Sequence, residues 1–183
     1  MAEKKSKTLK QAILDLFDKD DSKVMKALKT ITKSGTADEI PALMDVYVKA
    51  EEGPIKEELT KMLSSMKLEG GDVALVGLLR EERFKEHHPF ILTSIWNSGY
   101  QPVEHLDVIV NAGLRGDYMT AFEVLTILEN LEPPFDMDVI AVASLNVDDY
   151  LEEKEQDERT PIILQIKEVL DQYKSAVSPT SAG

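Results

Sequence analysis

An internal period of 33 residues is the feature that most limits what this 183-residue chain can fold into. Apolar residues recur at this interval over four units, in the columns Ile40, Val73, Leu106 and Val139; Leu43, Val76, Ile109 and Val142; and Val46, Leu79, Ala112 and Leu145. Further along each unit lie the columns Glu58, Ile91 and Val124; Leu59, Leu92 and Leu125; and Met62, Ile95 and Leu128. Repeats of this length are supersecondary units that bury their apolar faces against one another. Each unit therefore contains two helices.

The spacing of apolar residues inside each unit predicts an all-α fold. They recur three and four positions apart, as in Ile40, Leu43 and Met44, and strand-like alternation is nowhere sustained. Glycines and prolines, including Gly53, Gly99 and Gly113, break the chain into segments of helical length. We predict five antiparallel helix pairs: 7–18 with 21–33, 37–50 with 54–66, 71–82 with 86–98, 102–114 with 117–131, and 136–154 with 159–174. A compact helical bundle is the alternative arrangement.

The repeats predict one structural domain with short extensions. Residues 1–6 are read as a flexible basic arm, residues 7–175 as a single helical repeat domain, and residues 176–183 as a disordered tail. The first pair is expected to cap the array, and the last contains an insertion between Asp149 and Thr160. No apolar run of signal-peptide or membrane-span length follows the arm, so a cytoplasmic protein is expected.

Two segments resemble the short bacterial type of HEAT repeat. Glu39-Ile40-Pro41-Ala42-Leu43-Met44 is similar to that family's first-helix opening, and Glu52-Gly53-Pro54-Ile55-Lys56 to its Asp-x-x-Val-Arg turn, of which Asp21-Ser22-Lys23-Val24 is a closer version. The signatures of tetratricopeptide and ankyrin repeats are missing. The periodicity covers most of the chain, but the motifs cover only 21–66. The resemblance implies a right-handed α-α superhelix, HEAT/ARM-like, and a habit of binding proteins.

Charge and cysteine usage exclude several functions. The chain has 34 acidic and 21 basic residues, a net charge of −13, which opposes binding to nucleic acid and to anionic membranes. There is no cysteine, so disulfides, thiolate metal sites and cysteine nucleophiles are excluded. No set of acid, base and nucleophile converges. We predict no catalytic residue, no metal and no cofactor.

The second helix of each pair is the predicted partner-binding surface, because in such arrays it usually lines the concave side. At about 100° per residue, its positions facing away from the apolar columns form three ladders: Glu57, Phe90 and Glu123; Lys61, Ser94 and Ile127; and Ser64, Asn97 and Asn130. Phe90 and Ile127 are apolar where a solvated face is polar, which favours a contact patch. Packing of Phe90 near Pro89 is equally compatible. For Trp96 we predict a core position.

Three other features are interpreted as structural. The acidic residues Asp148, Asp149, Glu152, Glu153, Glu155, Asp157 and Glu158 are read as solvated helix ends and loop, with docking of a basic partner or a cation as alternatives. His88 aligns with Ile55 and Ala121, which favours packing over metal binding. Arg115-Gly116-Asp117 matches the integrin-recognition tripeptide, but a tight inter-helix turn explains it.

The sequence therefore predicts a non-enzymatic scaffold or adaptor that binds a protein or peptide on the second-helix surface. Its acidic surface would accelerate association with basic partners. An accessory lyase or other enzyme with a HEAT-like fold is the alternative, and a purely homo-oligomeric structural protein is a third. The sequence does not define the oligomeric state.

Overall fold

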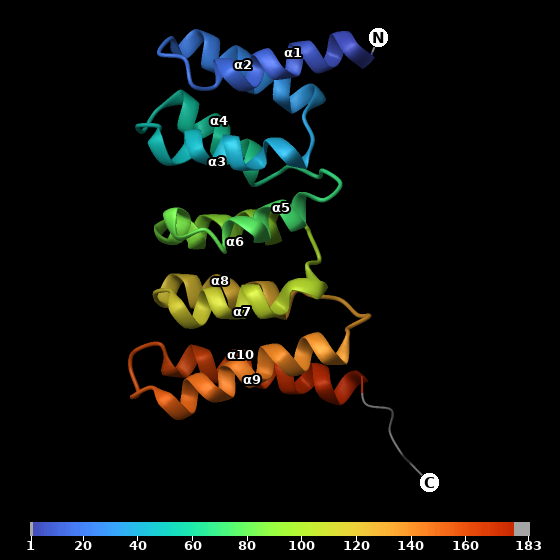
Figure 1. The fold of residues 1–183 in the computed structure, drawn as a ribbon. Helices are drawn as coiled ribbons and strands as arrows, with labels where there is room; N and C mark the ends of the chain where they lie inside the picture. The colour runs from blue at the N-terminus through green and yellow to red at the C-terminus, as the bar shows by residue number, and fades with distance from the viewer. Residues whose placement is uncertain (1, 178–183) are drawn as a thin grey trace. The chain divides into compact units, whose positions relative to one another are not determined.

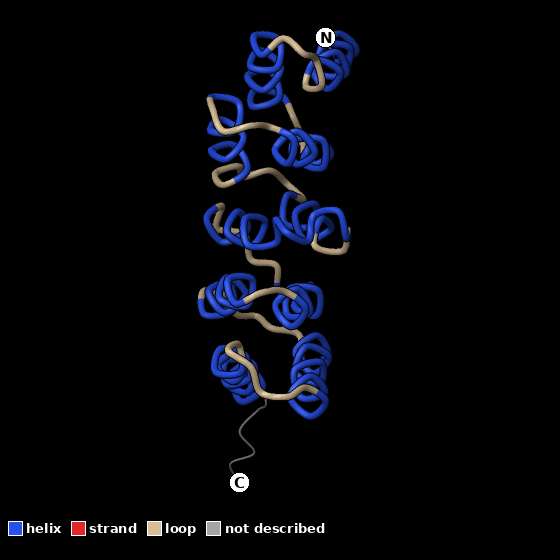
Figure 2. The backbone as a smooth tube through the Cα atoms, turned by 90° about the vertical axis from the view of Figure 1, so that its left-hand side faces the viewer, coloured by secondary structure: helices blue, strands red, loops and turns tan. Residues whose placement is uncertain are grey.

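The computed structural model describes the backbone of residues 2–177 and the side chains of residues 7–176. This part of the chain forms ten α-helices and three short 3-10 helices, with no strand, which confirms the all-α prediction (Figure 2). Contacts divide the chain into two compact units, Met1–Leu75 and Val76–Gly183. The single domain over residues 7–175 stays a prediction. In the predicted disordered tail, residues 176 and 177 belong to the last helix, and residues 178–183 lie outside the described residues.

Unit 1 contains two helix pairs, α1 (Ala2–Asp15) with α2 (Asp21–Ser34) and α3 (Ile40–Lys49) with α4 (Pro54–Leu63). Helix α2 begins where Asp20 accepts a hydrogen bond from Ser22 N. A short 3-10 helix, Ala37–Glu39, precedes α3 and has a capping box in which Thr36 N donates to Glu39 at 2.6 Å. Helix α1 begins at Ala2, so the backbone of residues 2–6 is helical, and the division of the chain into arm, domain and tail stays a prediction.

Unit 2 contains the remaining helices, and its boundary with unit 1 falls inside α5 (Gly71–Leu78). A 3-10 helix, η2 (Glu82–His87), leads into α6 (His88–Asn97), and η3 (Val103–His105) leads into α7 (Leu106–Arg115). Then follow α8 (Tyr118–Glu129), α9 (Met137–Glu153) and α10 (Thr160–Val177). Helix α8 packs against both α6 and α10, while α7 packs against α8 and α9 (Figure 1). The second helices of unit 2 thus form one layer and α7 and α9 another.

Burial follows most of the predicted columns, and the exceptions lie in α9, the first helix of the last pair, and at Val73. The columns that begin with Leu59 and Met62 are buried throughout, as are Leu43, Val76 and Ile109. Helix α9 instead buries Ile140, Ala143, Ser144 and Val147, and leaves Val142 and Leu145 exposed. These buried residues follow their counterparts in α7 by 34 positions, so the predicted register is wrong there by one residue. Val73 is also exposed, contrary to its column.

Gly113 lies inside α7 rather than at a break between helices. A Cβ atom at this position would stand 3.1 Å from Cγ2 of Val124, on the partner helix α8. The prediction that Gly113 breaks the helix is therefore wrong. The glycine allows α7 and α8 to approach closely, at the cost of the lower helix propensity of glycine.

Candidate functional site

The outward sides of α6, α8 and α10 carry apolar side chains that the described residues leave uncovered. On α8, Met119 and Phe122 are exposed, and a separation of three places them on one side of the helix. Trp96 is exposed on α6, and Leu164 is exposed on α10. We call these four residues the apolar patch.

A hydrogen bond between side chains joins the α6 and α8 parts of the patch. Trp96 is 37% exposed, and its indole Nε1–H donates to Oε2 of Glu123 on α8 at 2.8 Å. The prediction of a core position for Trp96 is therefore wrong. Because Glu123 directly follows Phe122 and lies one turn after Met119, the indole lies next to the exposed stripe of α8.

A hydrogen bond between α10 and α8 shows how these two helices, which carry Leu164 and Phe122, pack against each other. The hydroxyl of Tyr173 on α10 donates to the carbonyl of Leu128 on α8, and burial, with the nearby charge of Glu129, raises the pKa of this phenol to about 12. Leu164 lies nine residues before Tyr173 on α10, and Phe122 lies six residues before Leu128 on α8. Leu164 and Phe122 are therefore exposed on two helices that pack against each other.

Exposed acidic groups lie on two of the helices that carry the patch, and acidic residues dominate the charge of unit 2. Glu129, Glu168 and Asp171 are exposed on α8 and α10. Residues 76–183 include 20 acidic and 8 basic residues, a net charge of −12, whereas residues 1–75 are close to neutral, with 14 acidic and 13 basic residues. The field around the patch therefore favours a basic partner.

The predicted site residues divide between the surface and the interior. In unit 1, Glu57 and Lys61 are exposed and Ser64 is half-buried. In unit 2, Asn97 and Asn130 are exposed, and Phe90 and Glu123 are half-buried. Ser94 and Ile127 are only 0% and 2% exposed, so their assignment to the binding surface is wrong.

The error for Ile127 has a physical cause. One turn before Ile127, Glu123 reaches across to Trp96, so this side of α8 faces α6 rather than solvent. A helix that packs against neighbouring helices on both sides exposes only a narrow stripe of side chains to solvent. The prediction instead treated every residue opposite the apolar columns as exposed. On α8 this stripe includes Met119, Phe122 and Thr126, with the spacing of three and four expected for one side of a helix. That spacing was visible in the sequence.

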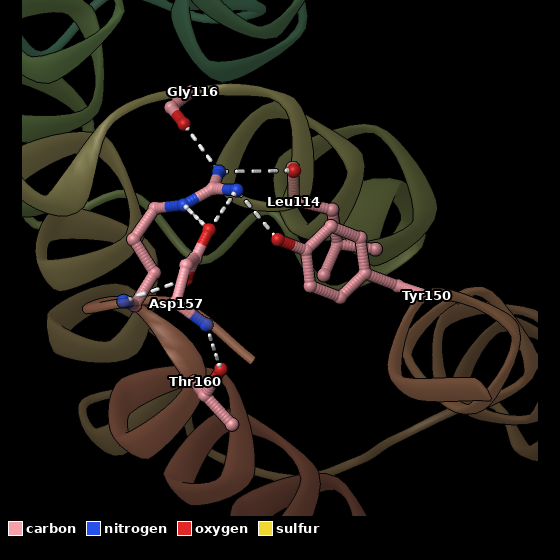
Figure 3. Close-up of polar contacts among 6 residues, drawn as sticks. Leu114, Gly116, Tyr150, Asp157 and Thr160 are labelled. Atoms are coloured by element: carbon pink, nitrogen blue, oxygen red, sulfur yellow. Dashed lines mark hydrogen bonds and ion pairs between the residues drawn. The ribbon is translucent and has the colours of Figure 1, made fainter. Parts of the chain in front are cut away.

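Arg159 is a structural residue that the sequence did not single out. It lies just before α10 and donates through Nη1 to the carbonyls of Leu114 (3.3 Å) and Gly116 (2.6 Å), at the end of α7 (Figure 3). Nη2 donates to the hydroxyl of Tyr150 at 2.6 Å and to Asp157 at 2.8 Å, and Nε donates to the same carboxylate at 3.1 Å. All five N–H groups of the guanidinium thus have acceptors. Arg159 ties the loop before α10 to the end of α7.

Two residues of the acidic run form ion pairs within unit 2. Asp148 on α9 pairs with Lys167 on α10, and Asp157 pairs with Arg159. The hydrogen bonds from Arg159 lower the pKa of Asp157 below its ordinary value. Among the described residues, no three His, Asp or Glu side chains are placed to hold a metal ion together.

The Arg-Gly-Asp tripeptide spans the turn from the end of α7 to the N-cap of α8. Asp117 is the N-cap residue and accepts hydrogen bonds from N and Oγ1 of Thr120, at 2.8 and 2.6 Å. These two hydrogen bonds lower its pKa. A Cβ atom at Gly116 would come within 2.5 Å of the Thr120 side chain, so the turn requires glycine. These contacts confirm the interpretation as an inter-helix turn.

Comparison of the chain with protein-family models, with curated protein sequences and with solved structures gave no match in any of the three. None of the described helices is long and apolar enough to cross a membrane.

Proposed function

We propose that this protein is a non-enzymatic adaptor that binds a basic amphipathic segment of a partner protein on the apolar patch of unit 2. The observation that carries the proposal is the exposure of large apolar side chains on three adjacent helices, namely Trp96, Met119, Phe122 and Leu164. Isolated exposed apolar residues are ordinary, but a group surrounded by polar ones is typical of contact surfaces.

The chemistry of the patch favours a helical or extended segment with one apolar and one basic side. Trp96 and Phe122 offer large, stiff anchors of the kind that dominate binding energies. Glu129, Glu168 and Asp171 on α8 and α10 would attract lysine or arginine and would raise the association rate. The net charge of −12 on unit 2 supports the same choice of partner.

We also propose that the helix pairs belong to a HEAT-like superhelix. The spacing of 33 to 34 residues between equivalent buried positions, and the layered packing of α6, α8 and α10, support this assignment. In such an array the second helices form a continuous surface, which is where the apolar patch lies.

The position of Trp96 provides a direct test, because it is the one tryptophan of the chain and belongs to the patch. The probe is an amphipathic Lys/Leu peptide of about five helical turns, compared with a scrambled peptide of the same composition. Binding should change the emission of Trp96 and weaken as salt is raised, because exposed charges are screened. The scrambled peptide should leave the emission unchanged.

Two matched variants locate the binding surface. Phe122→Ser should weaken the binding about tenfold or more, since truncation of a buried aromatic anchor costs at least this much. Leu145→Ser removes an apolar side chain from α9 that is more exposed than Phe122, and it should leave the affinity unchanged. Equal binding of the scrambled peptide, or equal affinity of wild type and Phe122→Ser, would refute the proposal. The same two variants then serve as baits for the native partner.

A further inference from the structure

A depression on the other layer of unit 2 gathers basic side chains. It has a volume of about 340 Å³ and lies where the end of α5 and η2 meet α7. Its lining includes Arg80, Lys85, His88, Asn111 and Arg115. None of these residues belongs to the apolar patch, so this site is separate from the proposed adaptor surface.

The two arginines of the depression are unpaired. Neither the guanidinium of Arg80 nor that of Arg115 has a hydrogen-bond or ion-pair partner among the described residues, and both side chains are exposed. The other two arginines of the chain, Arg83 and Arg159, both pair with carboxylates. Unit 2 has more than twice as many acidic as basic residues, so a shortage of carboxylates does not explain why Arg80 and Arg115 form no ion pair within the described part of the chain.

His88 provides a second, independent observation. The side chain is only 7% exposed, and its Nε2 atom is buried without a hydrogen-bond partner among the described residues. A buried polar atom without a partner destabilises the folded state, so such atoms are uncommon in folded proteins. Because this atom is also shielded from solvent, an oxyanion in the depression would reach it as an acceptor only when the lining moves aside on binding.

The charges that line the depression favour an anion despite the acidity of unit 2. Three of the 8 basic residues of unit 2 lie here, against only Glu82 and Asp107 of its 20 acidic residues. The carboxylate of Glu82 stands 3.4 Å from Nζ of Lys85, which offsets its charge. The two guanidiniums therefore remain available, and guanidinium groups bind phosphate through paired N–H donors.

We propose that this depression binds a small phosphate-bearing molecule, with Arg80 and Arg115 holding the phosphate group and Lys85, His88 and Asn111 forming the wall around it. The volume is within the range of small-molecule sites in proteins. The ligand would occupy the layer of α7, so it and a partner on the apolar patch could be bound together.

The test uses isothermal titration of the full chain with inorganic phosphate and with phosphoserine, at constant ionic strength. Wild type should bind both with a stoichiometry of one. Arg80→Gln and Arg115→Gln should each weaken the binding about tenfold or more, as expected for loss of a charged hydrogen-bond donor. Arg83→Gln is the matched control, because Arg83 lies on η2 but does not line the depression. This variant also loses one arginine charge, and it should bind phosphate as tightly as wild type does.

Nuclear magnetic resonance locates the ligand independently of affinity. Phosphate should shift the ring nitrogen signals of His88 in wild type, with smaller shifts at His105, which does not line the depression. Absence of binding to wild type, or equal weakening in Arg83→Gln, would overturn the proposal. Succinate binding as tightly as phosphate would overturn the assignment of a phosphate group. Tighter binding of a phosphoserine peptide than of phosphoserine itself would overturn the assignment of a small molecule.

Discussion

Replacement of Arg159 by methionine should destabilise unit 2, because this guanidinium connects three segments of the fold. Methionine keeps most of the apolar stem and removes all five N–H donors. The carbonyls of Leu114 and Gly116 would then lose a charged donor at the C-terminal end of α7. The hydroxyl of Tyr150 would lose its contact as well.

The size of the effect follows from these contacts. A hydrogen bond to a charged group contributes about 1.5–3 kcal/mol, but water can replace part of it at a side chain that is 19% exposed. We count nothing for Asp157, which is exposed and whose charge water screens. The expected loss is therefore about 2–3 kcal/mol of the free energy of unfolding. Arg159→Lys should recover less than half of it, since one ammonium cannot reach all three segments.

Urea unfolding followed by fluorescence measures this loss, because Trp96 is the one tryptophan and reports on unit 2. Arg83→Met is the matched control. The Arg83 side chain is half exposed, pairs with Glu81 at 2.7 Å and lies over the ring of Phe84. Its replacement should cost less than about 1 kcal/mol, as is usual for surface pairs. If Arg159→Met lost no more stability than Arg83→Met, the structural role assigned to Arg159 would be wrong.

Three further predictions concern stability. The pKa of Asp117 is lowered in the folded state, so its carboxylate stabilises the fold above about pH 4. This contribution is lost as the pH falls through the lowered pKa. Asp117→Asn should therefore make the free energy of urea unfolding depend less on pH in the acid range. Tyr173→Phe should cost about 1 kcal/mol for one buried hydrogen bond and remove the tyrosine that ionises at a pH of about 12 in an ultraviolet titration. Gly113→Val should cost about 2 kcal/mol in thermal unfolding, because its side chain would overlap Val124, whereas no loss would refute the close approach of α7 and α8.

Local signals located the helices well. The predicted ranges 21–33, 54–66 and 117–131 correspond to α2, α4 and α8, with ends displaced by at most three residues. Helix ends depend on residues that are close together in the sequence, such as Asp117 and Thr120, which form the cap of α8. Such signals can therefore be recognised in the sequence itself. The buried columns of the second helices were also predictable, because an apolar stripe must face the partner helix.

The candidate site was predicted less well. The second-helix surface was the predicted location, yet the apolar patch includes Met119, Phe122 and Leu164, which the prediction did not include. Ser94 and Ile127 are buried, and Trp96 is exposed. The period identifies equivalent positions, but it does not determine how wide a stripe the neighbouring helices leave uncovered.

The sequence alone determined the helical class, the pairing of α1 with α2, α3 with α4, α7 with α8 and α9 with α10, and the positions of most turns, because these depend on periodicity and on short-range capping. The tertiary structure decided which side chains reach solvent and which distant groups meet. Arg159 finds its acceptor at Leu114 across 45 residues, and α9 turns by one residue relative to its column so that Leu145 faces outward. Both depend on how helices pack against their neighbours, and no local pattern in the chain encodes that packing.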